Sequence, residues 1–445
     1  MKARLVPLSF AAPDDPEFAG QTQRLRELLA EVAEILEPLP LGAPLPDADA
    51  VVFPQLVGEA YRRVPEIRAL SLPILVLTSE FGTMAMWDWE IISYLRDEGV
   101  STMAPYSLAA ATTACRALAA KRQLREGRFL AYQDRPGEGG RQPGIFKRFY
   151  WWEDECVDRI RDKFGLTIEK RSFEELGARA KAMPDAVAQQ EWERLRDRVP
   201  IGDVSERATL SALKLYRAVR DDLDGDDGVL SAGINCLNES GFSDTTPCLA
   251  WNLLYQERDL IWGCEADLVS MLTKFIVHRS LRVPIMMTNL YPFLMGQAAL
   301  KHERIPEFPA VEGEDPENYV LAAHCGYLGV VPQPFATDWK LREKVLEIVD
   351  ENSAVLDARL PLGDVTLSKL DPTFDTLVIV EGELTGYAGY PGSDCRNGAL
   401  IRVPNGHALM ERLPSHHSLL STGHDRPGLD LVGRVFDLRI EQIGA

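Results

Sequence analysis

The sequence predicts an α/β protein in which two N-terminal domains with parallel sheets precede a β-rich, barrel-like C-terminal domain. Before Leu281, short apolar segments alternate with amphipathic segments of helical length, which is typical of strand–helix–strand units. After Leu281 the apolar segments follow one another closely with turns between them, which is typical of antiparallel strands. With 445 residues, of which 46% are hydrophobic, the chain is long enough to bury several cores.

The first predicted domain covers residues 1–144. We expect its strands at Leu5–Phe10, Ala50–Phe53, Pro73–Thr78 and Arg128–Tyr132. Apolar residues at helical spacing predict one helix from Leu25 to Leu36, ended by Pro38, and a second over Leu108–Leu124. Residues 135–144 are rich in glycine and proline and have no periodicity, so we place the domain boundary there.

The second predicted domain covers residues 145–285. It opens with a helix at Glu153–Phe164 that ends at Gly165, a residue type suited to a helix C-cap. A strand is expected at Leu166–Lys170, and a pair of polar helices is expected within residues 172–221. These alternating elements predict a second parallel sheet.

The third predicted domain covers residues 286–445. Strands are expected at Tyr319–Ala323, Val365–Leu367 and Thr376–Val380, with turns between them. A helix near Pro427–Leu438 and a strand at Arg439–Ile443 are expected to end the chain.

Composition excludes several classes of protein. The chain carries 48 Lys and Arg against 67 Asp and Glu, a formal charge of −19, which argues against a nucleic-acid partner and an anionic membrane surface. No apolar stretch approaches the ~18–20 residues that span a bilayer, and Leu5–Ala12 is interpreted as a strand rather than a signal peptide. The seven cysteines contain no CxxC pair, so we expect reduced thiols and a cytoplasmic location.

Two acidic residues follow predicted strands. Glu239 ends the segment Gly233–Glu239, and Asp267 ends the segment Leu260–Asp267. Because parallel sheets bind ligands at the carboxyl ends of their strands, the two carboxylates are candidates for one site. Asp267 also precedes a helix, so capping that helix is the alternative role for its side chain.

Histidines supply the remaining candidates. Three of the seven histidines lie within Ser415–His424, which is interpreted either as a strand reaching the surface or as a polar loop. His324 follows the expected strand Tyr319–Ala323. A zinc site built from His324, Cys325 and Cys264 is a further alternative, although the spacing of these residues matches no zinc motif.

Taken together, these segments resemble the L-fucose/L-arabinose isomerase superfamily, and its shorter L-fucose isomerase-like branch in particular. The similarity covers most of residues 145–445. The matching segments, in chain order, are Ile234–Glu239, Gly263–Asp267, Gly363–Leu370, Glu381–Glu383, Cys395–Arg396, His416–His417 and Gly423–His424. Leu237-Asn238 departs from the Gln-Pro that often precedes the glutamate in fucose isomerases.

The resemblance implies a function and a set of ligands. Family members bind Mn²⁺ and convert aldoses to ketoses through a cis-enediol, so the resemblance implies that Glu239, Asp267 and His417 bind a divalent metal. Glu239 and Asp267 would also transfer the proton between C2 and C1 of a pentose or a modified hexose. His324, His416 and Trp87 are weaker candidates for contact with the sugar.

Other functions and the assembly remain to be distinguished. A lyase, an epimerase or a glycoside hydrolase could use the same acids, and a sugar-binding protein without turnover is a further alternative.

The resemblance implies a homo-oligomer, a trimer or a hexamer, in which Trp87 of the N-terminal domain would contact the sugar. A place for Trp87 in the core or in an interface is the alternative. The aromatic run Phe149–Trp152 is expected to be exposed beside a domain boundary.

Overall fold

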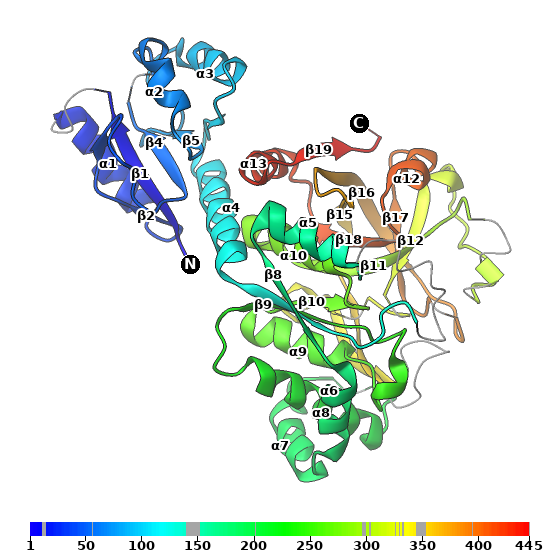
Figure 1. The fold of residues 1–445 in the computed structure, drawn as a ribbon. Helices are drawn as coiled ribbons and strands as arrows, with labels where there is room; N and C mark the ends of the chain where they lie inside the picture. The colour runs from blue at the N-terminus through cyan, green and yellow to red at the C-terminus, as the bar shows by residue number, and fades with distance from the viewer. Residues whose placement is uncertain are drawn as a thin grey trace. The chain divides into compact units, whose positions relative to one another are not determined.

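The computed structural model describes residues 1–10, 15–55, 57–138, 152–200, 202–295, 300–301, 304–324, 326–328, 330–331, 333–343, 353–393 and 395–444. The chain forms two compact units (Figure 1). Unit 1 comprises Met1–Arg125, Ile276–Arg282 and Asp425–Arg439, and unit 2 comprises Glu126–Phe275, Val283–His424 and Ile440–Ala445. No helix in these described ranges is long and apolar enough to cross a membrane.

Unit 1 contains a parallel sheet with the strand order β2-β1-β4-β5-β6, to which β3 adds beside β1. Its strands are β1 (Ala3–Ser9), β2 (Ala33–Ile35), β3 (Leu39–Pro40), β4 (Ala50–Phe53), β5 (Ile74–Val76) and β6 (Thr102–Met103). Its helical segments are α1 (Pro16–Leu28), α2 (Val64–Arg68), α3 (Asp88–Asp97), α4 (Leu108–Glu126) and α13 (Arg426–Phe436). Buried valine, isoleucine, leucine and phenylalanine side chains from the central strands form its core.

The expected helix from Leu25 to Leu36 is wrong in its second half. Helix α1 begins earlier, at Pro16, and ends at Leu28, and Ala33–Ile35 forms strand β2. In this strand Ala33 and Ile35 are buried and Glu34 is exposed, and the strand pairs in parallel with β1. Pairing with a neighbouring strand therefore overrides an apolar pattern that also suits a helix.

Unit 2 begins with a four-stranded parallel sheet in the order β10-β9-β7-β8. Its strands are β7 (Arg128–Tyr132), β8 (Thr167–Arg171), β9 (Val229–Ile234) and β10 (Ile261–Cys264). The boundary expected at residues 135–144 assigns Arg128–Tyr132 to the first sheet, but β7 pairs with β8 and β9 and lies inside the second sheet. The glycine- and proline-rich segment therefore follows the first strand of this sheet instead of separating two sheets.

Helices connect the strands of this sheet, as the predicted parallel arrangement requires. They are α5 (Asp154–Phe164), α6 (Phe173–Ala182), α7 (Asp185–Leu195), α8 (Glu206–Leu223), α9 (Cys248–Arg258) and α10 (Leu268–Leu281). Gly165 is the left-handed C-cap of α5, as predicted. Gly233 and Gly263 are paired across β9 and β10, and a Cβ atom on either would collide with Met271 of α10. The two glycines thus allow α10 to pack close to the sheet.

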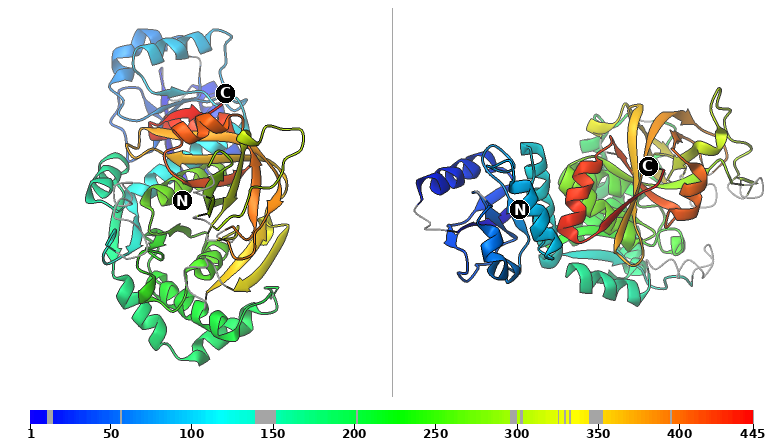
Figure 2. Two further views of the ribbon diagram at one scale, coloured as in Figure 1. Left: turned by 90° about the vertical axis from the view of Figure 1, so that its right-hand side faces the viewer. Right: turned by 90° about the horizontal axis from the view of Figure 1, so that it is seen from above.

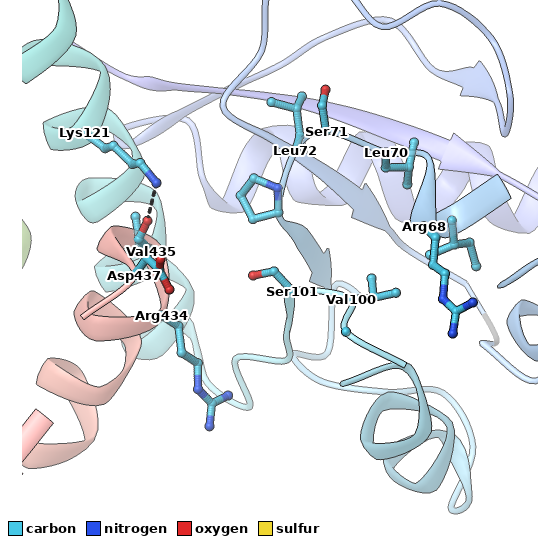
Figure 3. A pocket seen from close by; sticks show the side chains of 13 residues that line it. Arg68, Leu70, Ser71, Leu72, Val100, Ser101, Lys121, Arg434, Val435 and Asp437 are labelled. Atoms are coloured by element: carbon cyan, nitrogen blue, oxygen red, sulfur yellow. Dashed lines mark hydrogen bonds between the residues drawn. The ribbon is translucent and has the colours of Figure 1, made fainter. Parts of the chain in front are cut away.

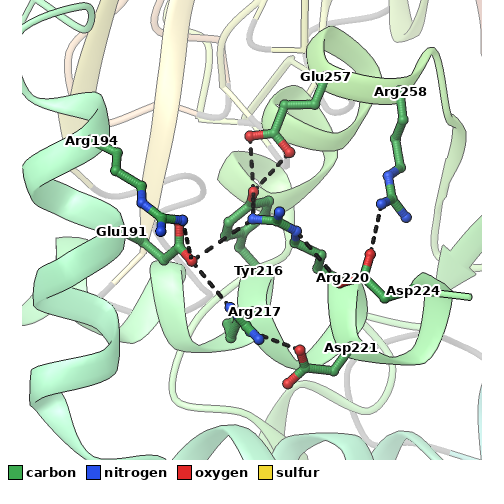
Figure 4. A network of polar contacts seen from close by, with 9 residues as sticks. All are labelled: Glu191, Arg194, Tyr216, Arg217, Arg220, Asp221, Asp224, Glu257 and Arg258. Carbon is green, nitrogen blue, oxygen red and sulfur yellow. Dashed lines mark hydrogen bonds and ion pairs between the residues drawn. The ribbon is translucent and has the colours of Figure 1, made fainter.

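A network of ion pairs and hydrogen bonds joins α7, α8 and α9 (Figure 4). The Glu191 carboxylate is buried and lies within 3.8 Å of guanidinium nitrogens of Arg194, Arg217 and Arg220. Tyr216 donates to Glu257, and Arg220 donates to the Tyr216 hydroxyl. The buried carboxylate thus links α7 to α8.

We expect Glu191→Ala to lower the free energy of unfolding by about 1–2 kcal/mol, because it removes charged hydrogen bonds while leaving arginines that are all at least partly open to water. Urea denaturation followed by circular dichroism would measure the change. Glu193→Ala, an exposed position on the same helix, is the matched control and should cost less than about 0.5 kcal/mol. Equal losses in the two variants would contradict a stabilising role for Glu191.

The second part of unit 2 is a closed, six-stranded antiparallel barrel (Figure 2). Its strands are β11 (Ile285–Pro292), β12 (Tyr319–Ala323), β15 (Gly363–Leu370), β16 (Thr376–Ala388), β17 (Gly398–Arg402) and β18 (His417–Thr422). The circuit β15-β18-β11-β12-β17-β16 closes because β16 also pairs with β15. The predicted β-rich C-terminal region is confirmed.

Smaller elements complete the unit. Strands β13 (Asp338–Glu343) and β14 (Ala354–Arg359) pair with each other, and α12 (Gly406–Arg412) precedes β18. Strand β19 (Arg439–Gln442) adds to β16 near the end of the chain.

Candidate active site

The candidate site lies at the carboxyl ends of the strands of the parallel sheet in unit 2. Chain order places β8 on one side of β7 and β9 on the other, so the topology reverses between β7 and β9. Open α/β sheets bind ligands at the carboxyl ends of the two strands at such a reversal. Asp134 follows β7 and Glu239 follows β9, so both lie at this edge.

Glu239 is fixed to the loop that follows β7. Its side chain is 6% exposed and accepts hydrogen bonds from the backbone N–H groups of Asp134 and Arg135 and from the amide of Asn235. It caps no helix with its side chain. Burial raises the pKa of the Glu239 carboxyl, although the two N–H donors oppose this. A carboxylate whose pKa is raised in this way is a better proton acceptor near neutral pH than an exposed one.

Asp267 is fully buried and accepts from three side chains. The Lys369 ammonium and the His417 Nδ1 both lie 3.0 Å from its Oδ2, and Ser270 donates through its hydroxyl and its backbone N–H. Burial alone would raise the pKa of Asp267, but Lys369 and His417 outweigh it and hold the pKa far below its usual range. The Ser270 N–H bond is the helix-capping role that the sequence left open for Asp267.

His417 begins β18, so the interpretation of this segment as a strand is confirmed and the polar-loop alternative is wrong, but the His417 side chain is completely buried rather than at the surface. Its Nδ1 faces Asp267, and its Nε2 lies 3.5 Å from Oε1 of Glu265. Because the ionised Asp267 only accepts, Nδ1 carries the proton of this hydrogen bond. Burial lowers the pKa of His417, but the carboxylates of Glu265 and Asp267 outweigh it and raise that pKa overall.

Glu265 is the site residue that sequence reasoning missed. It directly follows β10, and both Glu265 and Ala266 have positive φ angles, of 55° and 51°. Such a conformation is costly for residues with a Cβ atom, and strained residues of this kind cluster at functional sites. Its position immediately after a buried strand was the signal available in the sequence, but Asp267, which ends the same segment two residues later, was preferred.

Close to Glu265 and His417 is a side chain whose polar atoms have no hydrogen-bond partner among the described residues. His324 is buried, and neither of its ring nitrogens has a hydrogen-bond partner among the described residues. Burial and the charge of His417 lower the pKa of His324 to about 3, so its ring is neutral at physiological pH. Neutral imidazole nitrogens and a nearby carboxylate are the donors that a divalent transition metal takes in proteins. The chemistry of His324, His417 and Glu265 therefore suits such an ion.

The structure brings together some of the predicted site residues. Asp267 and His417 are hydrogen-bonded, whereas the contacts of Glu239 are with the loop after β7. His416 is exposed, and its ring lies 4.2 Å from that of His417. Within the part of the chain that is described, no group of three or more histidine, cysteine, aspartate or glutamate side chains is arranged to hold a metal ion.

Other predicted features have different outcomes. Trp87, in unit 1, is 56% exposed and is therefore no core residue. Trp152 is 2% exposed and donates to the carbonyl of Glu265, so the expectation that it is exposed is wrong; residues 149–151 lie outside the described residues. Cys325, of the zinc alternative, also lies outside them, and the Sγ of Cys264 is 3.3 Å from that of Cys236. All six described cysteines are buried and belong to no disulfide.

A cavity of about 340 Å³ in unit 1 is a weaker candidate for a ligand site (Figure 3). It is bounded by residues that precede β5 and β6, including Pro73 and Ser101, and so lies at the amino ends of these strands. Lys121 donates to the carbonyl of Val435 at one side, and Arg68 is paired with Glu98. Ligands of parallel sheets bind at the opposite edge, so the site in unit 2 is preferred.

Comparison with known proteins gives no assignment: no family model matches the chain, and no curated protein matches it.

Proposed function

We propose that this protein is a metal-dependent aldose–ketose isomerase that acts on a pentose or a modified hexose. The observation that carries the proposal is the buried chain Asp267–His417–Glu265, which holds one imidazole nitrogen against a carboxylate and directs the other toward a second carboxylate. Metal-binding histidines are commonly oriented in this way by a carboxylate behind the ring. The resemblance of residues 145–445 to the fucose isomerase branch supports the same function.

His417, Glu265 and His324 would hold the ion once their side chains rearrange, because no three such side chains among the described residues are already arranged for it, and Asp267 would lie behind His417 in place of the ligand role implied by the family. Both oxygens of Asp267 already accept hydrogen bonds, whereas His324 brings nitrogens without partners. When bound, a divalent ion such as Mn²⁺ would polarise the carbonyl and hydroxyl oxygens of the sugar. Glu239, which the family also places at the metal, lies at the carboxyl end of the neighbouring strand.

Glu239 would act as the base that moves the proton between C2 and C1. Its carboxylate is held by two backbone N–H groups, so it is positioned before the sugar binds. Its raised pKa brings it nearer to the pH at which a carboxylate can both take and return a proton. The Glu239 side chain is only 6% exposed, which would limit access of the water that otherwise protonates an enediol at random.

Screening for ketose formation tests the proposal directly. Pentoses, 6-deoxyhexoses and acidic sugars would be incubated with the protein, with and without Mn²⁺, in D₂O. We expect ketose formation that depends on the metal, with some deuterium at C1 or C2, because a carboxylate base can exchange its proton with solvent. Cleavage of the sugar or of a glycoside, or inversion without ketose, would favour a lyase, a glycoside hydrolase or an epimerase. Binding without any turnover would favour a sugar-binding protein.

We also propose that the protein is a homo-oligomer, as the family resemblance implies. Unit 1 exposes large apolar side chains close together in sequence: Met86 is 81% exposed, and Trp87 and Trp89 are more than half exposed. Apolar residues gathered on a surface commonly mark protein–protein contacts. We expect light scattering at micromolar concentration to give a mass of three or more chains.

Replacement of both tryptophans tests whether this surface takes part. The double variant Trp87→Ala with Trp89→Ala should shift the protein toward smaller species. The control is Met1→Ala, made behind an added initiator residue. It changes an exposed apolar residue elsewhere on the chain and should leave the mass in solution unchanged. A monomeric wild-type protein would contradict both the assembly and a role for Trp87 at a neighbour's site.

A further inference from the structure

A cavity of about 450 Å³ lies at the carboxyl ends of β7 and β8 in unit 2. Tyr132, the last residue of β7, and Arg171, the last residue of β8, both line it. The other lining residues come from the end of β8, from α6 with its N-cap, and from α8; they are Lys170, Ser172, Glu175, Arg179 and Asp222. Open α/β sheets bind ligands at this edge, so the cavity lies where the fold favours a ligand.

Positive side chains outnumber negative ones around the cavity. Two arginines and a lysine line it, against the two carboxylates of Glu175 and Asp222. The chain as a whole has a formal charge of −19. A protein of negative charge repels anions at long range, so an anionic ligand needs cations gathered at its site. The lining of this cavity provides them.

Arg171 has hydrogen-bonding capacity left for a ligand. Its Nε donates to Glu169 at 2.7 Å, and its Nη1 lies 3.8 Å from Oδ2 of Asp222. A guanidinium carries five N–H groups in a planar fork that fits a carboxylate or a phosphate. One hydrogen bond and one longer ion pair use part of this fork, so donors remain for an anion in the cavity.

Other side chains divide between holding Asp222 and facing the cavity. Arg179 donates twice to the Asp222 carboxylate, at 2.7 and 2.6 Å, and the Tyr132 hydroxyl donates to it at 2.8 Å. Lys170 uses one hydrogen bond, to the exposed Asp154, and an ammonium has three donors. The hydroxyl of Ser172 accepts from a backbone N–H of α6 and keeps its own hydrogen to donate.

A short loop joins the cavity to Glu239. Tyr132 lines the cavity, and Asp134, two residues later, donates its backbone N–H to the Glu239 carboxylate. Consecutive Cα atoms are 3.8 Å apart, so the Cα atoms of Tyr132 and Asp134 lie within about 7.6 Å of each other. The Asp134 carboxylate accepts from the N–H groups of Phe173 and Glu174 at the start of α6. Side chains, rather than these occupied N–H groups, must therefore bind an anion in the cavity.

We propose that this cavity binds the anionic group of the sugar substrate, a carboxylate or a phosphate, with Arg171 as its main ligand and Lys170 and Ser172 as further donors. The neighbouring position of Glu239 would then receive the uncharged part of the sugar. The inference deepens the proposed function by naming an acidic sugar or a sugar phosphate as the substrate class. It rests on the proposed function only for the identity of the uncharged part of the ligand.

A set of ion pairs that only stabilises the fold is the competing explanation. Arg128 offers a matched control, because it pairs with the same Glu169, at 2.8 Å, and its side chain is as exposed as that of Arg171, 30% against 28%. Arg128 begins β7 at the opposite edge of the sheet and does not line the cavity. Arg128→Gln and Arg171→Gln thus each remove an ion pair of Glu169, and only the second changes the cavity.

Calorimetric titration of the full-length protein with glucuronate, ribose 5-phosphate and ribose tests the inference. We expect wild type to bind at least one of the two anionic sugars about 10-fold or more tightly than ribose, and the tighter of the two identifies the anionic group. Arg171→Gln should weaken that binding by about 10–100-fold, the scale of a hydrogen bond between charged groups, and should leave ribose binding unchanged. Arg128→Gln should bind as wild type does, and circular dichroism would check that each variant folds.

Three results would overturn the inference. A wild-type protein that binds neither anionic sugar more tightly than ribose does so without any variant. A folded Arg171→Gln protein that keeps wild-type affinity would also overturn it, as would an Arg128→Gln protein that loses affinity equally. Ketose formation judges the proposed function separately. Anionic sugars that bind through Arg171 without being isomerised would contradict the isomerase and leave the anion site standing, whereas neutral sugars isomerised at equal rates by wild type and Arg171→Gln would support the isomerase and contradict the anion site.

Discussion

Glu239→Gln is expected to slow isomerisation by about 10²-fold or more, the usual scale for loss of a general base. Glutamine keeps the shape of the side chain and an oxygen that can accept the N–H bonds of Asp134 and Arg135. It cannot accept the proton from C2. We therefore expect the variant to stay folded and to keep most of its sugar affinity, so that the loss falls on kcat.

The control for this variant is the same change at a distant glutamate. Glu193 is exposed on α7, and Glu193→Gln should turn over at the wild-type rate. Turnover in D₂O adds a second measurement, because incorporation of deuterium should fall together with the rate in Glu239→Gln. If Glu239→Gln retains near wild-type activity, Glu239 is not the base and the role carried over from the family is wrong at this residue.

The sequence was informative where local pattern and topology agree. Glu239 and Asp267 were found because each ends an apolar segment, and strands β9 and β10 do lie side by side with their carboxyl ends at one edge. His417 was implied by the family resemblance, and the structure joins it to Asp267 across 150 residues of chain. Short strands buried on both faces leave a pattern that survives in the sequence.

The sequence was uninformative where a contact depends on the fold as a whole. Glu265 and Asp267 are two residues apart, and two successive left-handed residues, Glu265 and Ala266, decide which carboxylate faces His417 Nε2. No propensity predicts such a turn for residues with a Cβ atom. Lys369 comes from a barrel strand 102 residues away, so no local sequence pattern around Asp267 predicts this partner.

The same reason explains the errors in the fold. Residues 33–35 carry an apolar pattern that suits a helix, and only the neighbouring strand β1 makes them a strand. Strand β7 was placed with the first sheet because a breaker-rich segment follows it, although its partners are β8 and β9. Strand pairing is a contact between distant segments, and a single sequence does not specify it.

Glu265→Gln is expected to weaken Mn²⁺ binding more than Asp267→Asn does, which reverses the order that the family implies. Loss of the Glu265 carboxylate would remove a charged ligand, and we expect a fall of more than about 10²-fold in affinity, beyond the 10–100-fold typical of residues behind a ligand. For Asp267→Asn the loss of Mn²⁺ affinity should stay within the 10–100-fold range, because this change disturbs His417 without removing a ligand of the ion. His417→Ala should lose binding as severely as Glu265→Gln.

Titration of the metal-free protein with Mn²⁺ decides between the two carboxylates, because it measures affinity without requiring turnover. Asp162→Asn, at an exposed position on α5, is the matched control and should bind as wild type does. Removal of Asp267 also leaves the Lys369 ammonium buried without its counter-ion, so each variant needs a thermal unfolding curve to separate loss of the fold from loss of a ligand. A folded Asp267→Asn protein that binds Mn²⁺ more weakly than Glu265→Gln would return Asp267 to the ligand set. That result would require the ion to displace Lys369 or Ser270 from Oδ2, since the oxygen has no free capacity while both are bound.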